Sequence, residues 1–389
     1  MMATNTMRLA RKWGRHIRNT ISSQPDLFTT RISSDSAAQE QWTTTADGEF
    51  IAIGVGGQPA GLGANLLITD DPIGARREAN SETYRENVWD WWRGTIFTRL
   101  EPGGKAVVMH TRWNEDDLIG RILADEGMGL SRCKVISLPA IAEEDEDVDG
   151  WTRKKGEALW PERWPIEKLE RRRAAVGRFE WAAQYQQRPT PLGGAVFRRQ
   201  DFRYFRYGVD WYELVQGDGT VKRLPFSDCW LAQTCDTAIT AKTTSNYTVC
   251  TTFAVGPDHE LLVIDVARAK LEVPDQIAWL LQQRAKWPSV RWQGIEPKAS
   301  GKGILQQARR TGHPFRELSG SEVDKVTRAS PVSVMYENGM VYHKAGADWL
   351  DACESELLAF PNGKHDDQVD TISYAGRECG ASELQVFLV

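Results

Sequence analysis

Four carboxylates in the second half of the chain stand where packing alone does not explain them. Asp236 closes the apolar run that begins at Trp230, and Glu296 ends the run VRWQGIE. Asp366 and Asp367 open a helix-like segment, HDDQVDTISYA. An unpaired acid at the end of a buried strand is costly for packing but leaves an anionic group within reach of water and metal. Because Mg²⁺ and Mn²⁺ take oxygen ligands, acids brought from separate elements to one sheet end predict a two-metal centre that cleaves phosphodiesters.

A second acidic pair lies in the first half. Asp70 and Asp71 follow the apolar run LLIT, which is typical of a buried parallel strand. The carboxyl ends of such strands face the ligand crevice, so the pair is placed where the Mg²⁺ of a nucleotide would bind. The alternative is a turn in which Asp71 precedes Pro72 and caps the next segment.

The residues after this pair predict a β-α-β unit. Ser81 can cap a helix that runs through WDWWRGTIFTRL, and the turn EPGG leads to a strand, AVVMH, which ends at Thr111 and Arg112. Asn114 is the expected N-cap of a further helix that runs to Leu123. This unit resembles the second half of a P-loop motor core, although the phosphate-binding pattern GxxxxGK[ST] occurs nowhere in the sequence.

The second half predicts a fold of its own. Three apolar strands, LAQTCD, YTVCTTFAV and ELLVIDVA, form an antiparallel meander, and helices then alternate with a further strand. This is the ribonuclease H-like order. It puts Asp236 on the first strand and Glu296 at the end of the fourth, and the terminal helix starts at Asp366 or Asp367.

Basic and acidic residues near these acids are candidates for supporting roles. Lys298, Lys325 and Arg328 are predicted to contact phosphates beside the metals, and each could instead be an ordinary surface charge. Asp370 lies one turn after Asp366 and is predicted to stand behind the direct ligands or at the surface. His365 could orient a ligand, shuttle a proton or cap the helix.

Length and composition bound the class of protein. A chain of 389 residues with 41% hydrophobic content exceeds one ordinary core, so two domains are expected. The net charge of -5 argues against a protein that coats nucleic acid indiscriminately. No apolar run is long enough for a membrane span, and the basic N-terminus is expected to form a solvated helix. Six scattered cysteines without a CxxC pair predict a reduced cytosolic compartment and no structural zinc.

The boundaries follow from composition shifts. Residues 1–142 are predicted to form a partial motor domain, and residues 193–389 the nuclease domain. Between them, residues 143–192 form a linker region with an acidic loop and a helix from about Ile166 to Gln187. The segment Pro-Thr-Pro-Leu-Gly-Gly that closes it is a plausible hinge.

Taken together, eight segments resemble the large terminase subunit of tailed bacteriophages and prophages. In chain order they are LLITDDPI, VVMHTRW, LWPERW, QYQQRP, CDTAI, GIEPKASG, DKVTRASP and HDDQVD. That family joins an ATPase motor to a ribonuclease H-like nuclease, and it moves viral DNA into a procapsid and cuts it. The resemblance therefore implies an α/β chain with a partial P-loop-type ATPase domain before the nuclease domain. Its implied partners are double-stranded DNA, a small terminase subunit and a portal protein, in the bacterial host cytoplasm.

The resemblance also implies roles for single residues. Asp70 matches the acid that holds Mg²⁺, Asp71 the acid that activates water, and the pair Thr111 and Arg112 the motif that couples hydrolysis to movement. Asp236, Glu296 and the Asp366/Asp367 pair match the nuclease acids.

The sequence departs from the family in two places. It begins without the phosphate-binding loop, which suggests a truncated or split gene product and makes ATP binding depend on another polypeptide. Asn246 stands where an Asp is expected.

Three functional classes remain open at this point. The first is an active DNA endonuclease of the packaging machinery, which the ordered segments favour. The second is an inactive prophage remnant that acts only as an assembly component. The third is another ribonuclease H-like enzyme, such as a resolvase or transposase, which the motor-like first half disfavours.

Overall fold

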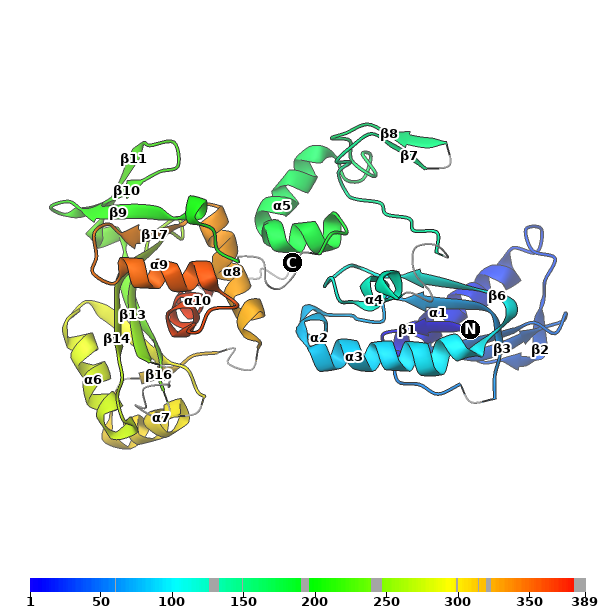
Figure 1. Ribbon diagram of the computed structural model, residues 1–389, viewed down its shortest axis with the longest axis horizontal. Helices are drawn as coiled ribbons and strands as arrows, with labels where there is room; N and C mark the ends of the chain where they lie inside the picture. Colours follow the sequence, from blue (N-terminus) through cyan, green and yellow to red (C-terminus); the bar gives the residue numbers. More distant parts are fainter. Residues whose placement is uncertain are drawn as a thin grey trace. The chain divides into compact units, whose positions relative to one another are not determined.

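The computed structural model of the chain describes residues 1–59, 61–125, 133–148, 150–189, 196–238, 247–298, 300–313, 315–319 and 323–380. It divides into two compact units (Figure 1). The first comprises Met1–Leu169 and Glu180–Pro191, and the second comprises Glu170–Phe179 and Leu192–Val389. The predicted hinge, Pro189 to Gly194, and Asn246 fall largely or wholly outside the described residues. Within those residues, no helix is both long and apolar enough to cross a membrane.

The first unit is built on a sheet with the order β2-β3-β4-β1-β5-β6. Its strands are β1 (Met2–Thr4), β2 (Ile32–Ala37), β3 (Gln41–Thr44), β4 (Glu49–Gly54), β5 (Ala64–Asp70) and β6 (Leu100–Met109), with a separate hairpin of β7 (Glu146–Val148) and β8 (Trp151–Arg153). Its helices are α1 (Met7–Ser23), α2 (Arg76–Asn80), α3 (Glu82–Trp91) and α4 (Leu118–Ala124), and α5 (Ile166–Glu180) is divided between the two units. Strands β4, β1, β5 and β6 are parallel neighbours.

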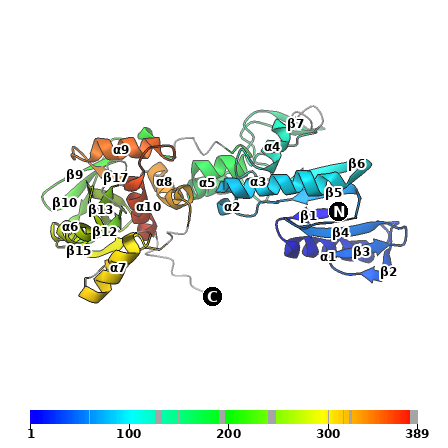
Figure 2. The same ribbon diagram turned by 60° about the horizontal axis from the view of Figure 1, so that its bottom comes forward.

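Helices cover both faces of this sheet. Figure 2 shows α1 and α3 on opposite sides of β1, β4 and β5. On the α1 side, the buried ring of Trp42 donates from Nε1 to the carbonyl oxygen of Gly14. On the α3 side, the indole of Trp92 donates to Thr69 Oγ1 and is 2% exposed. Burial of such large apolar side chains is worth about 1.5–3 kcal/mol each and fixes the strand ends that carry polar residues.

Two local predictions in this unit met different outcomes. Ser81 caps α3 as expected, because its side chain accepts from the Tyr84 amide. The predicted cap at Asn114 is wrong, since Asp117 caps α4 by accepting from the Gly120 amide. Asn114 instead accepts from the amide two residues on, at Asp116, which makes a turn that delays the helix.

The second unit contains a sheet with the order β11-β10-β9-β17-β14-β13-β12-β15-β16. Its strands are β9 (Arg203–Tyr207), β10 (Trp211–Val215), β11 (Val221–Pro225), β12 (Trp230–Asp236), β13 (Thr248–Val255), β14 (Leu261–Ala269), β15 (Val290–Ile295), β16 (Phe315–Glu317) and β17 (Val341–Lys344). Its helices are α6 (Val273–Ala285), α7 (Ser300–Thr311), α8 (Lys325–Glu337), α9 (Leu350–Ala359) and α10 (Asp367–Gly380). The predicted meander is present, because β12 and β13 pair antiparallel, as do β13 and β14.

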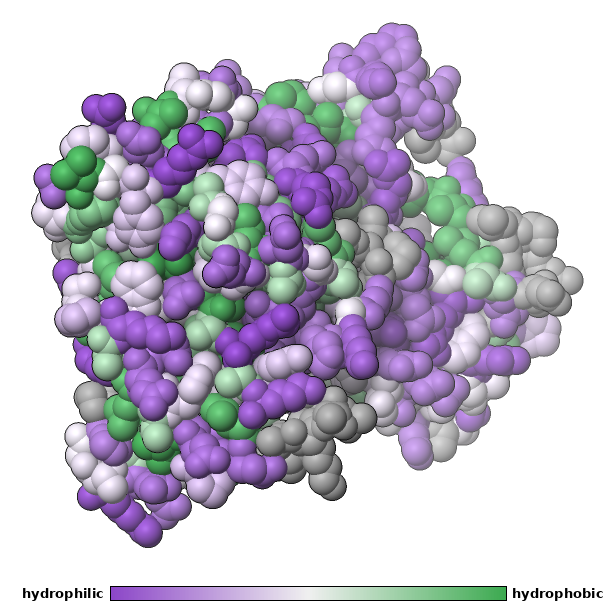
Figure 3. All heavy atoms as spheres, turned by 60° about the vertical axis from the view of Figure 1, so that its left-hand side comes forward, coloured by the Kyte–Doolittle hydropathy of each residue, from purple (hydrophilic) through white to green (hydrophobic). Residues whose placement is uncertain are grey.

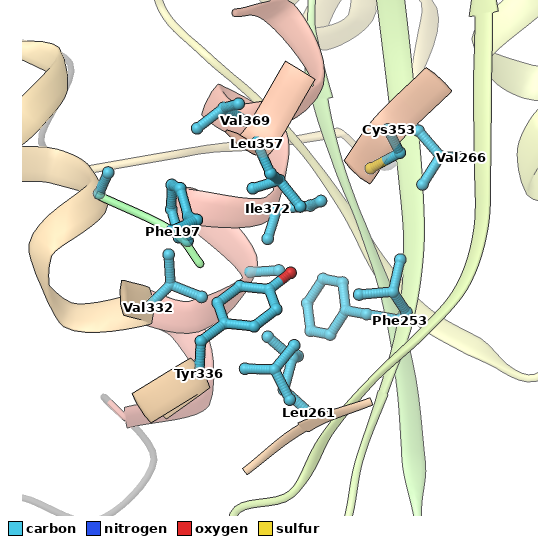
Figure 4. Close-up of a cluster of buried hydrophobic side chains, with 14 of the residues drawn as sticks. Phe197, Phe253, Leu261, Val266, Val332, Tyr336, Cys353, Leu357, Val369 and Ile372 are labelled. Atoms are coloured by element: carbon cyan, nitrogen blue, oxygen red, sulfur yellow. The ribbon is translucent and has the colours of Figure 1, made fainter. Parts of the chain in front are cut away.

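The main core of this unit lies between the sheet and the helices α8, α9 and α10. Figure 4 shows Tyr336 beside Phe253 of strand β13, with Phe197 in the same cluster. A second cluster lies on the other face of the sheet, where Ile277 of α6 and Ile304 of α7 pack with Cys235. Figure 3 shows one face of the surface, which is mostly hydrophilic with scattered hydrophobic residues. The central strands are thus buried on both sides, which makes their ends rigid supports for a site.

Candidate functional site

Two strands bring the first two acids together. Asp236 is the last residue of β12, and Glu296 follows β15 directly. The two strands run parallel with Cys235 opposite Ile295, and the Glu296 amide donates to the Cys235 carbonyl oxygen at 3.0 Å. Because adjacent strands lie about 4.8 Å apart, both carboxylates emerge side by side at one end of the sheet.

Helix α10 adds a third acid to this pair. It is fixed on the sheet through Thr371, whose carbonyl oxygen accepts from Thr234 Oγ1 at 2.8 Å and whose hydroxyl lies 2.7 Å from Thr251 Oγ1. Asp370, one residue before Thr371, therefore reaches the sheet end. One carboxylate oxygen from each of Asp236, Glu296 and Asp370 lies within 4.8 Å of the others.

The sequence did not predict that Asp370 lies in the cluster with Asp236 and Glu296. Asp370 is 4% exposed, so the alternative that it lies at the surface is excluded. The available signal was its spacing from Asp367, because residues three apart share one face of a helix. A metal site that draws on Asp367 at the start of α10 could have been extended to Asp370 on that ground.

The two acids that the sequence placed at the start of α10 have different surroundings. Asp366 forms an ion pair with Lys325, with 2.5 Å between Oδ2 and Nζ. Asp367 is 2% exposed and accepts from the Tyr247 amide at 3.1 Å. Helix α10 begins at Asp367, as predicted. Glu356 of α9 holds this helix start, because it accepts from the Gln368 amide at 2.6 Å.

Cations surround the acidic cluster. Arg328 is fully buried, with Nη1 3.2 Å from Glu296 Oε1 and Nη2 2.7 Å from Asp370 Oδ1. Lys298 Nζ lies 3.1 Å from the same Glu296 oxygen. Lys298 and Lys325 are each 48% exposed at the side chain, whereas Arg328 is 0% exposed. The two lysines thus lie where a phosphate can approach, while Arg328 lies in the interior and joins two acids.

Asp236, Asp370 and Asp367 have raised pKa values, and burial is the main cause for each. Burial raises the pKa of Asp236 well above its ordinary value, and the charges of Glu296, Asp370 and Asp367 raise it further. Burial also raises the pKa of Asp370, although Arg328 opposes that shift. For Asp367, burial raises the pKa to about 6. Clustered buried carboxylates either take up protons or bind cations, so this arrangement suits a positively charged ligand.

His365 lies beside this cluster rather than within it. Its Nδ1 is 3.9 Å from Asp367 Oδ2, and its ring centre is 5.8 Å from that of Tyr247 in an edge-on arrangement. The spacing exceeds a hydrogen bond, so the structure gives His365 contact with the rim of the site but no direct bond to the acid.

A second group of polar residues lies at the ends of β5 and β6 in the first unit. Asp70 ends β5, and Asp71 has a φ of 42°, a left-handed conformation that is uncommon outside glycine. The Thr111 amide donates to Asp71 Oδ1 at 2.6 Å, and Arg112 Nε donates to Asp117 Oδ2 at 2.8 Å. The strand register thus brings the predicted acidic pair beside Thr111.

The two acids of this group differ in their pKa values. Burial and the charge of Asp71 raise the pKa of Asp70. Burial also acts to raise the pKa of Asp71, but interactions with His110 and Thr111 outweigh it and lower that pKa. Asp71 is therefore an anion held by donors, whereas Asp70 retains unbalanced charge that a cation would relieve.

The sheet order of the second unit defines its class. Numbered along the chain, the meander β12, β13 and β14 and the following β15 and β16 have the spatial order 3-2-1-4-5, with acids at the ends of strands 1 and 4 and on the last helix. This is a ribonuclease H-like domain. Residues 233–377 match the family model described as "Terminase RNaseH-like domain". The terminase resemblance predicted from the sequence is thereby confirmed.

Solved structures are similar to the chain at low identity. The large terminase from a thermophilic bacteriophage is 12% identical, with 97% of this chain and 85% of that chain covered and a TM-score of 0.42. The large terminase nuclease from thermophilic phage G20c is 16% identical, with 48% and 98% covered and a TM-score of 0.33. The large terminase nuclease domain of Thermus phage P74-26 is 18% identical, with 47% and 94% covered and a TM-score of 0.32. A comparison with curated proteins finds no match.

Proposed function

We propose that this chain acts as the large subunit of a phage DNA-packaging terminase, and that its second unit cuts double-stranded, concatemeric DNA with two divalent cations, Mg²⁺ or Mn²⁺. The observation that carries this proposal is the convergence of Asp236, Glu296 and Asp370 within 4.8 Å at one sheet end of a terminase RNaseH-like domain.

The donor set fits hard divalent cations. All three groups are carboxylates, and neither a cysteine nor a histidine belongs to the cluster among the described residues. Oxygen-only sites favour Mg²⁺ and Mn²⁺ over Zn²⁺, which prefers nitrogen and sulfur. The raised pKa values of Asp236 and Asp370 reflect burial and mutual repulsion, which a bound cation would offset.

Each acid has a proposed role in holding the metal ions. Asp236, on the rigid central strand, would bridge both ions, and Glu296 would bind one of them. From α10, Asp370 would join Asp366 or Asp367 as the remaining ligand. When bound, a pair of divalent ions activates the attacking water and stabilises the leaving 3′ oxygen.

The cationic residues divide into two kinds in this proposal. Lys298 and Lys325 are half exposed and would bind phosphates beside the scissile bond. Arg328 was also expected to contact DNA, but its burial between Glu296 and Asp370 favours a role in orienting those two acids. The network would hold the ligands in place before substrate arrives, which limits the reorganisation needed during cleavage.

The first unit has a proposed role in ATP-driven translocation. Asp70 would hold the Mg²⁺ of ATP, Asp71 would orient the attacking water, and Thr111 with Arg112 would couple hydrolysis to movement. The 389 residues hold no GxxxxGK[ST] pattern, so the nucleotide phosphates lack the lysine and amides that usually bind them. We therefore propose that the first unit binds ATP only together with a phosphate-binding loop from outside these 389 residues. The proposed partners of the chain are a small terminase subunit and a portal protein, and its proposed location is the bacterial host cytoplasm.

Plasmid cutting tests the nuclease proposal. The full chain with Mn²⁺ is expected to nick and linearise plasmid DNA, and Asp236→Asn, Glu296→Gln and Asp370→Asn are each expected to slow cutting by about a hundredfold or more. Asp366→Asn, which loses the ion pair with Lys325, is expected to cut faster than Asp370→Asn, because Asp366 does not belong to the three-acid cluster. The matched control is Asp218→Asn, at an exposed acid in the turn between β10 and β11.

Two outcomes would reject the proposal in different ways. Equal cutting by wild type and the three site variants would show that the cluster is not the catalytic centre. No cutting by wild type, with portal binding intact, would favour the inactive assembly component.

A further inference from the structure

Three residues form a basic and aromatic surface beside the acidic cluster. Arg268 lies near the end of β14, Lys270 follows that strand, and Tyr247 precedes β13. The Arg268 guanidinium lies 4.9 Å from the centre of the Tyr247 ring, and Lys270 Nζ lies 5.0 Å from the same centre. Two cations on one ring place a concentrated positive charge at this edge of the sheet.

Strand register places this surface on the same face as the catalytic acids. Asp236 is opposite Val249, and Val249 is opposite Arg268, so the three form one row across β12, β13 and β14. Directly opposed residues in antiparallel strands point to the same side, and neighbouring strands are about 4.8 Å apart. Arg268 therefore starts about 10 Å from Asp236, within reach of the groups that flank a ligand bound there.

The same surface is tied to the start of α10. The Tyr247 amide donates to Asp367 Oδ2 at 3.1 Å, and the Tyr247 ring stands edge-on to His365. Tyr247 and Lys270 come opposite each other one step beyond the pair Thr248 and Ala269. Tyr247 thus links the two sets of charges, because its ring contacts the cations and its backbone amide donates to the buried Asp367 carboxylate.

Charge defines what this surface can bind. Lys298 and Lys325 lie on the side of the cluster formed by β15, α7 and α8, whereas Arg268 and Lys270 lie two strands away on the other side of Asp236. Cations on both sides of an anionic metal site match a polyanion that continues in both directions from the reacting group. The phosphodiester backbone of DNA has this form, with one phosphate per 3.4 Å along each strand.

We infer that Tyr247, Arg268 and Lys270 form a phosphate-binding surface that positions the DNA backbone on the β14 side of the cleavage site. The inference rests on the proposed nuclease function and extends it to substrate contacts. Arg268 and Lys270 bind phosphates near the scissile one, and Tyr247 holds the two cations in place. The three are positioning residues, since they touch the substrate backbone but not the reacting atoms.

Salt-dependent DNA binding tests this inference. The full chain carrying Asp236→Asn, which is expected to slow cutting, is titrated with a fluorescent DNA duplex at a series of NaCl concentrations. Arg268→Gln and Lys270→Gln are each expected to reduce the slope of log Kobs against log[NaCl] by about 0.9, and the double variant by about 1.8. Tyr247→Leu is expected to weaken binding about two- to fivefold without changing the slope, because the ring carries no charge.

Arg223 provides a matched control. Its guanidinium also lies 4.9 Å from an aromatic ring, that of Trp211, but on β11 at the far edge of the sheet. Arg223→Gln is expected to retain the wild-type slope. A wild-type slope in the Arg268/Lys270 double variant, or an equal loss in Arg223→Gln, would overturn the inference.

Folding and function are separated by two further measurements. Arg268→Lys keeps the charge and is expected to retain the slope, so a loss there together with a lowered Tm would assign Arg268 a structural role and overturn its part in binding. Absence of plasmid cutting by the protein without Asp236→Asn would reject the nuclease proposal. The slopes report DNA binding rather than cutting, so they test the phosphate-binding surface independently of the nuclease proposal.

Discussion

Arg328 Nη2 lies 2.7 Å from Asp370 Oδ1, and both side chains are buried. The same guanidinium reaches Glu296 and lies 5.1 Å from the ring of Tyr374, so one cation connects α8 to α10 and to the end of β15. Desolvation is costly for each of these charges, and their mutual pairing offsets that cost only while all of them are present.

Removal of this cation is expected to destabilise the second unit. Arg328→Met leaves Glu296 and Asp370 buried without their partner, and we expect a loss of about 3 kcal/mol in the free energy of unfolding. Urea denaturation of the metal-free protein measures it. Arg309→Met is the control, because its ion pair with Glu317 at 3.2 Å is 73% and 53% exposed and should be worth less than about 1 kcal/mol. Equal stability of the two variants would contradict the structural role of Arg328.

The raised pKa of Asp367 predicts a defined pH dependence. Burial raises this pKa from 3.8 to about 6, so between these values the folded state binds more protons than the unfolded state. Stability then falls as pH rises through that window. We expect metal-free wild type to lose stability relative to Asp367→Asn from about pH 4 to about pH 6, measured by thermal unfolding in EDTA.

Metal should reverse this trend. At pH 7 the proposed site is expected to bind Mg²⁺ and so to stabilise the folded state by mass action, and the Tm of wild type should rise with Mg²⁺ concentration. Asp236→Asn removes the central ligand and is expected to lose most of that rise.

The pH prediction has its own contrary outcome. A constant difference in stability between metal-free wild type and Asp367→Asn across the pH window would show that Asp367 has an ordinary pKa.

ATP turnover by the chain alone is expected to be negligible. The reason is the absence of a GxxxxGK[ST] pattern in the sequence, despite the ordered contact between Asp71 and the Thr111 amide. Steady-state phosphate release with and without DNA measures it. Robust turnover that Asp70→Ala abolishes would show that the first unit binds ATP in another way.

Residues from Gly193 onward are expected to fold on their own. The second unit has two apolar clusters, one on each face of its sheet, and its acids come from elements after that point. A protein that starts at Gly193 should unfold cooperatively in urea. Because Arg178 also bonds to Glu337, a protein that starts at Glu170 is the matched comparison. Aggregation of the shorter protein but not of the longer one would move the boundary upstream.

Several features of the fold were predictable because their signals are local. Asp236 and Glu296 end apolar runs whose length and β-branched content are typical of buried strands, and Ser81 precedes a helix as a cap. The meander of β12, β13 and β14 followed from three such runs in succession along the chain. The order of elements along the chain, a three-stranded meander followed by alternating helices and strands, was enough to predict a ribonuclease H-like domain.

Other elements depend on pairing between distant segments. Strand β1, of three residues, inserts between β4 and β5, and β17 joins β9 to β14. Nothing in such short runs specifies a partner, because their position is fixed by the packing of helices on both faces rather than by their own pattern. The cap at Asp117 instead of Asn114 has a more local cause, since Asp117 accepts from Arg112 and Asp116 accepts from Arg121.

The sequence by itself determined which acids stand at strand ends, and with them the oxygen-only chemistry of the proposed metal site. Only the tertiary structure decided that Asp370 joins Asp236 and Glu296, and that Arg328 lies buried among them instead of facing solvent. The physical reason is that a strand end is fixed by local periodicity, whereas the inward direction of a helical side chain depends on how the helix packs. Helices α8 and α10 turn Arg328 and Asp370 toward each other because both bury apolar faces in the same core.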